Sequence, residues 1–210
     1  MNEEIYNSVK LSGIVIDIGG GKQPSYQRLL FEKSDSITFH LIILDIVPDI
    51  NVNVVGSITH LPFRSSSVNY ILCFNVLEHV FDYALALAEI WRVLKPNGIL
   101  YGRVPFLFGI HEDPYDYWRY TKKTLEEILY RANFTEISIK THGGLFLVIL
   151  NLINPFLKIS IIKVICAIVA ITMNYLCSII IGDQRNHEKY PIGYFFSARK
   201  QLKEKTSEPQ

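Results

Sequence analysis

The sequence has few cysteines, and none of them form a pair with metal-ligand spacing. Only Cys73, Cys166 and Cys177 are cysteine among 210 residues, and no CxxC motif is present. An odd number of cysteines in apolar surroundings excludes a disulfide scaffold and favours a reducing compartment. The first ten residues include two acids and no apolar stretch, so we expect no signal peptide and a cytoplasmic location.

The sequence also lacks an excess of either charge. It has 21 basic and 20 acidic residues, a net charge of +1, and no basic tract. A nucleic-acid-binding protein usually shows a basic surplus, so we expect no nucleic-acid partner. Hydrophobic residues make up 49% of the chain, which excludes a disordered protein.

Charge is almost absent from one segment, residues 144–181. It contains Lys158, Lys163 and no acid. Asn154 and Pro155 divide it into a part too short to span a bilayer and a part at the lower limit of spanning length. We therefore expect a helical insertion over residues 144–182. Its exposed apolar faces would contact the inner face of the cell membrane or a lipid-like acceptor, a second subunit in a homodimer, or the protein's own pocket.

The remaining pattern alternates buried strands with helices. It predicts an α/β, Rossmann-like domain with a mostly parallel seven-stranded sheet, helices on both faces and the apolar insertion before the last strand. One domain is expected over residues 1–210, with its core at 12–142 and 190–200 and a frayed tail at 201–210. The expected strands are 14–18, 39–44, 52–55, 68–74, 99–104, 134–141 and 194–199, and the expected helices are 25–33, 81–94 and 121–132.

Acids and glycines follow the first two strands. Residues 17–21 read DIGGG, and Asp45 ends the second strand. Ligands of such sheets bind at the carboxyl ends of the strands, where a carboxylate after the second strand can accept both hydroxyls of a ribose. Neither GxGxxG nor the P-loop motif is present. The pattern therefore favours a nucleoside-containing ligand over a phosphate-anchored one.

Four motifs occur in a characteristic order: DIGGG at 17–21, HLPF at 60–63, VLEHV at 76–80 and LKPNG at 94–98. With them the sequence resembles class I S-adenosylmethionine-dependent methyltransferases of the small bacterial type 11 family. The run HEDPYDYWRYT at 111–121 resembles a subgroup that works in sugar, lipid and cell-surface biosynthesis. The resemblance covers residues 12–142 and the last strand.

The resemblance implies S-adenosylmethionine as cofactor and gives roles to individual residues. Asp17, Gly19 and Gly21 would line its methionine end, and Asp45 would bind its ribose. Ser57 and Ile58 would flank the adenine, and Asn75 would touch the sulfonium region. Three positions depart from the family pattern, because Gln23 replaces a glycine, Ser57 replaces an acid and Asn97 replaces a second glycine.

Methyl transfer to a hydroxyl group requires removal of a proton, so a base is useful. The candidates are His79 and His111, with Asp113 or Asp116 as the orienting partner. Arg119 could hold an anionic acceptor because its planar fork matches a carboxylate or phosphate. Glu78 is interpreted as a charge at a helix N-terminus. No cluster of histidines and acids has ligand spacing along the chain, so no metal is expected.

The expected activity is methyl transfer to a small or lipid-linked acceptor, such as a cell-surface saccharide intermediate. Membrane-proximal assembly of such an acceptor would account for the apolar insertion. Two alternatives stay open: a methyltransferase acting on an isoprenoid quinone-type ring, and a non-catalytic scaffold that binds the cofactor. Neither the identity of the acceptor nor its accepting atom follows from the sequence.

Overall fold

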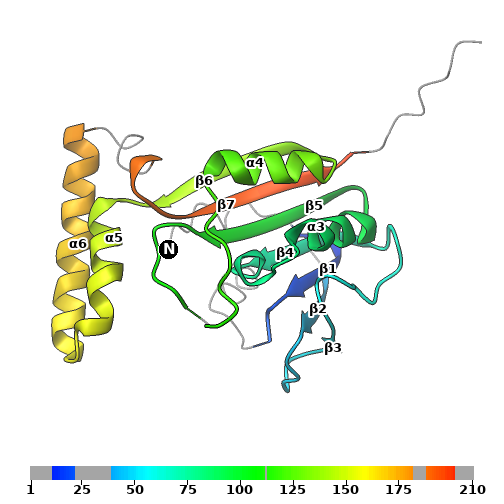
Figure 1. Ribbon diagram of the computed structural model, residues 1–210, viewed down its shortest axis with the longest axis horizontal. Coiled ribbons are helices and arrows are strands. Elements are labelled where there is room, and N and C mark those ends of the chain that lie inside the picture. Colours follow the sequence, from blue (N-terminus) through cyan, green and yellow to red (C-terminus); the bar gives the residue numbers. More distant parts are fainter. Residues whose placement is uncertain (1–10, 22–38, 112, 182–187, 202–210) are drawn as a thin grey trace, which may run out of the picture.

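A computed structural model describes residues 11–21, 39–111, 113–181 and 188–201. Seven strands form one sheet in the order β3-β2-β1-β4-β5-β7-β6 (Figure 1). The strands are β1 (Gly13–Ile18), β2 (Phe39–Asp45), β3 (Val54–Val55), β4 (Val68–Phe74), β5 (Leu94–Pro105), β6 (Phe134–Gly143) and β7 (Pro191–Lys200). The predicted sheet is confirmed, with a third strand shorter than expected and a last strand that is longer. The expected helix at 25–33 lies outside the described residues.

The order in which the strands are added to the sheet reverses at β1. The chain runs from β1 outward through β2 to β3, and then returns to build β4 and β5 on the other side of β1. All these pairs are parallel, with Asp17 in register with Ile43 on one side and Leu72 on the other. The carboxyl ends of β1, β2 and β4 therefore meet at one edge, next to the point where the strand order reverses. This is where open α/β sheets bind ligands.

The last strand is the antiparallel one. β7 inserts between β5 and β6 and runs opposite to both. The LKPNG turn lies at the start of β5, where the pairs Val68–Leu94 and Tyr70–Ile99 enclose a bulge. Asn97 adopts a φ of 64° in this bulge, a conformation that asparagine tolerates better than most residues.

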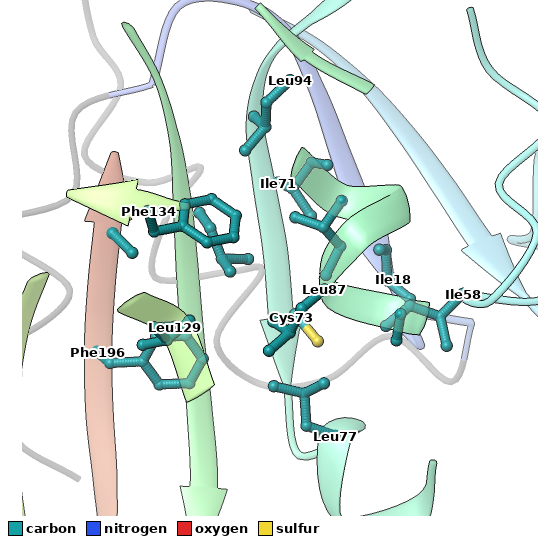
Figure 2. Packing of buried hydrophobic residues seen from close by; sticks show 14 of the residues in the cluster. Ile18, Ile58, Ile71, Cys73, Leu77, Leu87, Leu94, Leu129, Phe134 and Phe196 are labelled. Atoms are coloured by element: carbon teal, nitrogen blue, oxygen red, sulfur yellow. The ribbon is translucent and has the colours of Figure 1, made fainter. Parts of the chain in front are cut away.

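The two faces of the sheet carry different parts of the core. Ile16 and Ile18 of β1 belong to the larger cluster, which includes Leu87 of α3 (Tyr83–Val93) and Leu129 of α4 (Lys122–Arg131) (Figure 2). Val15 points to the opposite face, as alternation along a strand requires, and joins the cluster that contains Leu72. Both faces of β1 are therefore buried, which fixes the position of its carboxyl end.

Helices α3 and α4 begin at side-chain caps. Asp82 accepts a hydrogen bond from the amide of Leu85, and Thr121 accepts one from Thr124. These caps satisfy amide groups that have no partner inside the helix. The expected helix at 121–132 is confirmed within one residue at each end. The helix expected at 81–94 is shorter, because Val93 ends it and Leu94 already pairs in the sheet.

The apolar segment forms the expected pair of helices. α5 (Leu145–Ile153) and a turn of 3₁₀ helix, η2 (Asn154–Phe156), lead into α6 (Ser160–Ile181), which packs along α5. We call this pair, with its connection, the apolar hairpin. It projects from the end of the sheet where β6 stops (Figure 1). α6 is exposed along most of its length, including Ile161, Ile168 and Ile180. Most of its apolar surface is therefore left uncovered by the described residues.

Candidate functional site

Two glycines draw the loop after β1 close to its neighbours. Gly19 has a φ of 76° and donates a hydrogen bond from its amide to the carbonyl of Leu44 at 2.8 Å. A Cβ at this position would lie 2.5 Å from Cγ2 of Val76. Only glycine combines this φ with this close approach at low cost. The loop thus leaves its backbone close to the ends of β2 and β4.

Asp45 is joined to the same loop. Its Oδ2 accepts a hydrogen bond from the amide of Gly21 at 3.3 Å, and its Oδ1 accepts one from Val47 at 3.0 Å. A Cβ on Gly21 would lie 3.0 Å from Oδ2 and 2.8 Å from Val52. The carboxylate is half-buried and has acceptor sites left on both oxygens, as binding of a ribose diol requires.

Asp17 is fully buried at the end of β1, between β2 and β4. Its carboxyl is therefore not an exposed acid in this structure. Asn75, after β4, has an exposed side chain, a φ of 55° and an amide that donates to the carbonyl of Arg103 at 2.9 Å. The contacts predicted for both residues with the methionine part of the cofactor stay predictions.

The segment after β3 corrects one expectation. Ile58 is only 5% exposed and packs in the main core, so its side chain has almost no surface to offer an adenine ring. Ser57 is half-buried, and its Oγ lies 2.8 Å from Oγ1 of Thr59. Of the two predicted residues, Ser57 is the one with side-chain surface left for a nucleobase.

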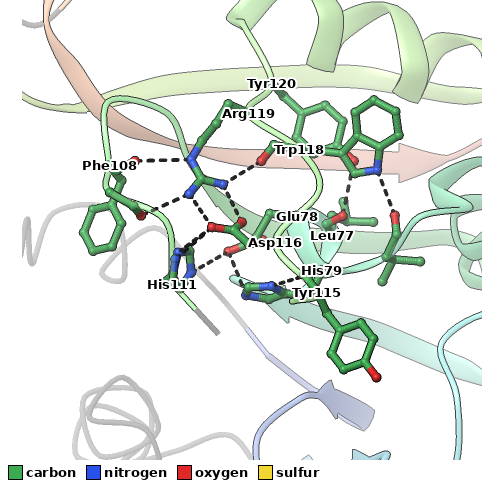
Figure 3. A network of polar contacts seen from close by, with 12 residues as sticks. Leu77, Glu78, His79, Phe108, His111, Tyr115, Asp116, Trp118, Arg119 and Tyr120 are labelled. Atoms are coloured by element: carbon green, nitrogen blue, oxygen red, sulfur yellow. Dashed lines mark hydrogen bonds and ion pairs between the residues drawn. The ribbon is translucent and has the colours of Figure 1, made fainter. Parts of the chain in front are cut away.

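The second half of the site is formed by η1 (Leu77–His79), after β4, and by the loop 111–121, after β5. Oε1 of Glu78 lies 3.8 Å from Nε2 of His79 and 3.8 Å from Nε2 of His111 (Figure 3). The two imidazole rings meet edge to face with centroids 4.9 Å apart. We call these three residues the Glu–His–His cluster.

Backbone contacts hold the loop 111–121 against η1. The carbonyl of Glu78 accepts hydrogen bonds from the amides of Tyr117 and Trp118. The indole of Trp118 donates to the carbonyl of Val80, and the buried hydroxyl of Tyr120 donates to the carbonyl of Leu77. Trp118 and Tyr120 therefore serve as packing and anchoring residues. These contacts fix His111 relative to Glu78 although the two are distant in sequence.

Glu78 lies in the first turn of η1, as the sequence predicts, but it is buried. Its side chain is fully buried, and neither carboxyl oxygen has a hydrogen-bond partner among the described residues. Burial raises the pKa of this carboxyl to about 8.

Arg119 is committed to the protein and is not free to hold an anionic acceptor. Its guanidinium forms a bidentate ion pair with Asp116, with both N–O distances 2.6 Å. The remaining N–H groups donate to the carbonyls of Phe108, Gly109 and Trp118, so every donor is used. The hydrogen bonds from Arg119 hold the pKa of Asp116 far below its usual range. The sequence-based role of Arg119 as an anion clamp is therefore wrong.

Asp116, rather than the exposed Asp113, is the partner of His111. Its Oδ2 accepts a hydrogen bond from the backbone amide of His111 at 2.9 Å and lies 3.3 Å from Nδ1 of the ring. On the other imidazole, Nδ1 of His79 donates to the carbonyl of Tyr115 at 2.9 Å, because a carbonyl can only accept. Nε2 of His79 is then the atom with the free lone pair, and it faces Glu78.

A separate groove of about 690 Å³ lies between α3 and α4. Tyr83, Trp91 and Glu127 are among its lining residues, and none of the site residues above contribute to it. The groove is on the helical face rather than at the carboxyl ends of the strands, so the chemistry is assigned to the strand ends.

Comparison with known proteins agrees with this geometry. Residues 33–102 match the family model for a methyltransferase domain of type 11. The demethylmenaquinone methyltransferase of Geobacillus stearothermophilus is 34% identical over 86 residues, which are 39% of this chain and 37% of the relative. The aligned segments span only 20 to 37% of the curated relatives' length.

Solved structures match over nearly the whole chain. A methyltransferase from Archaeoglobus fulgidus aligns with a TM-score of 0.59 at 17% identity, covering 90% of this chain and 86% of that one. Phosphoethanolamine N-methyltransferase 2 of Haemonchus contortus, in complex with S-adenosylmethionine, gives 0.58 at 18% identity, covering 94% of this chain and 50% of that one. Together, the solved structures show that the chain has the fold of class I S-adenosylmethionine-dependent methyltransferases, and the family model matches one third of it.

Proposed function

We propose that the protein binds S-adenosylmethionine at the carboxyl ends of β1, β2 and β4 and transfers its methyl group to an acceptor. The observation that carries this proposal is the half-buried Asp45 carboxylate, tied to the Gly21 amide at the point where the strand order reverses. The missing Cβ of Gly21 lets its backbone approach this carboxylate closely, since a Cβ there would lie 3.0 Å from Oδ2. The family match and the fold support the same cofactor.

When bound, the cofactor supplies a methyl group on a positively charged sulfur, which the acceptor displaces in line. Asp45 would accept hydrogen bonds from the two ribose hydroxyls, and the exposed amide of Asn75 would hold the methionine part. Nε2 of His79 would accept the acceptor's proton, because its Nδ1 already donates to a carbonyl. The loop 111–121 would position the acceptor in line with the methyl group, and such alignment alone can lower the activation barrier by several kcal/mol.

For the acceptor we propose a small or lipid-linked molecule, such as a cell-surface saccharide intermediate, reached at the cytoplasmic face of a membrane. The apolar hairpin supports this location. Within the described residues, one helix, α6, is long and apolar enough to cross a bilayer by length and composition. The chain leaves the sheet at β6 and returns to it at β7, so contact with one leaflet fits the topology better than a crossing.

The test is transfer of labelled methyl groups from S-adenosylmethionine into a membrane lipid extract and, separately, into a soluble metabolite extract. We expect label in the lipid phase, with none for the Asp45→Ala variant. Label only in the soluble phase would retain the methyltransferase and reject the lipid-linked acceptor. Cofactor binding without transfer to any extract would establish the non-catalytic scaffold.

A quinone-type ring is the second candidate acceptor, and the similarity to a demethylmenaquinone methyltransferase favours it. The aligned part is limited to 39% of this chain and 37% of the relative, so the similarity alone does not decide the acceptor. A purified demethylated naphthoquinol offered beside the lipid extract separates the two candidates, because only one of them would take up label.

A further inference from the structure

The Glu–His–His cluster has the donor set of a metal centre. We propose that Glu78, His79 and His111 bind one divalent transition-metal ion, with zinc as the ion that best fits two imidazole nitrogens and one carboxylate oxygen. The fold brings together groups that the sequence separates, so the sequence-based reason for expecting no metal does not hold.

The three donor atoms lie close together. One atom from each residue lies within 4.8 Å of the others, and both Nε2–Oε1 distances are 3.8 Å. These distances are too long for hydrogen bonds. Ligand atoms around a tetrahedral zinc ion, bound at about 2.0–2.2 Å, lie roughly 3.3–3.6 Å apart. A contraction of a few tenths of an ångström to about one ångström would close the site around an ion.

Both histidines are oriented as metal ligands usually are. A ligating imidazole normally directs its other ring nitrogen to a carbonyl or carboxylate, which fixes the ring and leaves the ligating lone pair free. His79 does this through the carbonyl of Tyr115 at 2.9 Å. His111 has its Nδ1 3.3 Å from Asp116, which is itself held by Arg119. The role of Arg119 is thus to position Asp116 behind the ligand His111.

The buried carboxyl group of Glu78 is a second, independent observation that indicates a missing ligand. Both its carboxyl oxygens are buried without a hydrogen bond among the described residues. A buried polar group without a partner costs free energy, so native proteins rarely keep one. A cation between Oε1 and the two imidazoles would provide that partner.

The donor set selects the class of ion. Calcium and magnesium prefer sites built from oxygen, whereas imidazole suits zinc, iron, nickel and copper. Three protein ligands leave a fourth position open, as in catalytic zinc sites. This last step rests on the proposed function: the fourth ligand would be the hydroxyl oxygen of the acceptor. In that form the ion takes over the role proposed above for Nε2 of His79, because a bound metal ion lowers the pKa of the hydroxyl and no base on the protein is required.

The methyl-transfer step then balances as follows. The metal-bound hydroxyl releases its proton to water, and its oxygen forms a bond to the methyl carbon. The bond from that carbon to sulfur breaks, and its electron pair stays on sulfur. The products are the methyl ether, a proton and S-adenosylhomocysteine.

The test is binding of metal to chelator-treated full-length protein, measured by calorimetry with Zn²⁺ and by the visible absorption of Co²⁺. We expect one equivalent for the wild type. Glu78→Gln and His111→Ala should each lower the affinity about tenfold or more, and Asp116→Asn about tenfold through the orientation of His111. His40→Ala is the matched control, because His40 is exposed on β2 and lies outside the cluster.

Folded wild type, verified by circular dichroism, that shows no heat with Zn²⁺ and no Co²⁺ band would overturn the metal site. So would binding that survives in both Glu78→Gln and His111→Ala. Calorimetry with S-adenosylhomocysteine on the same samples separates the two proposals. Cofactor binding without metal rejects only the metal site, and metal binding without cofactor rejects only the proposed function.

Discussion

Asp116 and Arg119 form a bidentate ion pair in which both N–O distances are 2.6 Å. The carboxylate side chain is 1% exposed and the guanidinium 24%. Arg119 also donates to the carbonyls of Phe108 and Gly109, so it joins the loop 111–121 to the segment that precedes it. Asp116 in turn accepts a hydrogen bond from the amide of His111, so the ion pair connects the segment after β5 to this histidine.

Arg119→Lys should destabilise the protein, because a lysine ammonium cannot replace five donors in a planar fork. We expect a loss of about 2 kcal/mol, which lowers Tm by roughly 4–8 °C in a chain of this size. Arg131→Lys is the matched control. Arg131 forms an exposed pair with Glu127 on α4, and such pairs contribute little. Equal shifts for the two variants in a thermal melt would contradict this role of Arg119.

The HLPF segment after β3 is held by a second ion pair, Glu89–Arg92 of α3. Glu89 accepts a hydrogen bond from the amide of Leu61, and Arg92 donates to the carbonyls of Leu61 and Phe63. The hydrogen bond from Arg92 lowers the pKa of Glu89. A carboxyl whose pKa is lower in the folded state stabilises the fold above its unfolded pKa and loses that effect as the pH falls through its folded pKa.

Glu89→Gln should therefore lower Tm at pH 7 by an amount that corresponds to about 1–2 kcal/mol. The gap between wild type and variant should narrow as the pH falls below about 4.3, the ordinary value for this side chain. Thermal melts at a series of pH values measure the gap. A gap that stays constant down to the acid limit would show that Glu89 acts through packing alone.

Gly19→Ala should weaken both folding and cofactor binding. A φ of 76° costs a non-glycine residue about 1–2 kcal/mol, and the new Cβ would lie 2.5 Å from Cγ2 of Val76. We expect a lower Tm and a loss of affinity for S-adenosylhomocysteine. Gly109→Ala is the control, because a Cβ there has no described atom within 4 Å. Unchanged binding in Gly19→Ala would remove the glycine loop from the site.

The apolar hairpin gives a prediction on membrane contact. Ile161 and Ile168 are 68% and 60% exposed on α6, and Lys158 and Lys163 lie nearby without any acid in the segment. We expect the protein to float with vesicles of phosphatidylcholine and phosphatidylglycerol, and to bind pure phosphatidylcholine more weakly. The double variant Ile161→Asp, Ile168→Asp should stay in solution.

Tyr130→Asp is the control for added charge, because Tyr130 is equally exposed but lies on α4. It should float like the wild type. Wild type that stays in solution with every vesicle and elutes as a dimer in light scattering would assign the hairpin to a second copy of the chain and contradict the membrane contact.

Much of the fold could be predicted because local patterns and tertiary structure agree. Buried β-branched runs that end in glycine or acid identified β1 and β2, and with them Asp17 and Asp45. The Glu–His–His cluster could not be found in this way. His79 and His111 belong to different loops, and only the pairing of β4 with β5 brings these loops together.

Arg119 illustrates a second limit of prediction from the sequence. Its spacing of three residues from Asp116 was visible in the sequence, but an arginine can turn to an internal carboxylate or to a ligand. The choice depends on carbonyl groups at Phe108 and Gly109, whose position follows from the folded loop. Ile58 is a similar case, because its apolar side chain suits an adenine ring and a protein core equally well.

The most direct test of the central claim is calorimetric titration of the protein with S-adenosylmethionine and S-adenosylhomocysteine, in parallel with Asp45→Ala and Asp49→Ala. Asp49 is an exposed acid whose Oδ1 accepts from Asn51 within its own turn, so it serves as the control. We predict binding by the wild type and Asp49→Ala, and its loss in Asp45→Ala. Folded wild type that binds neither ligand, or Asp45→Ala that binds as well as wild type, would contradict the account.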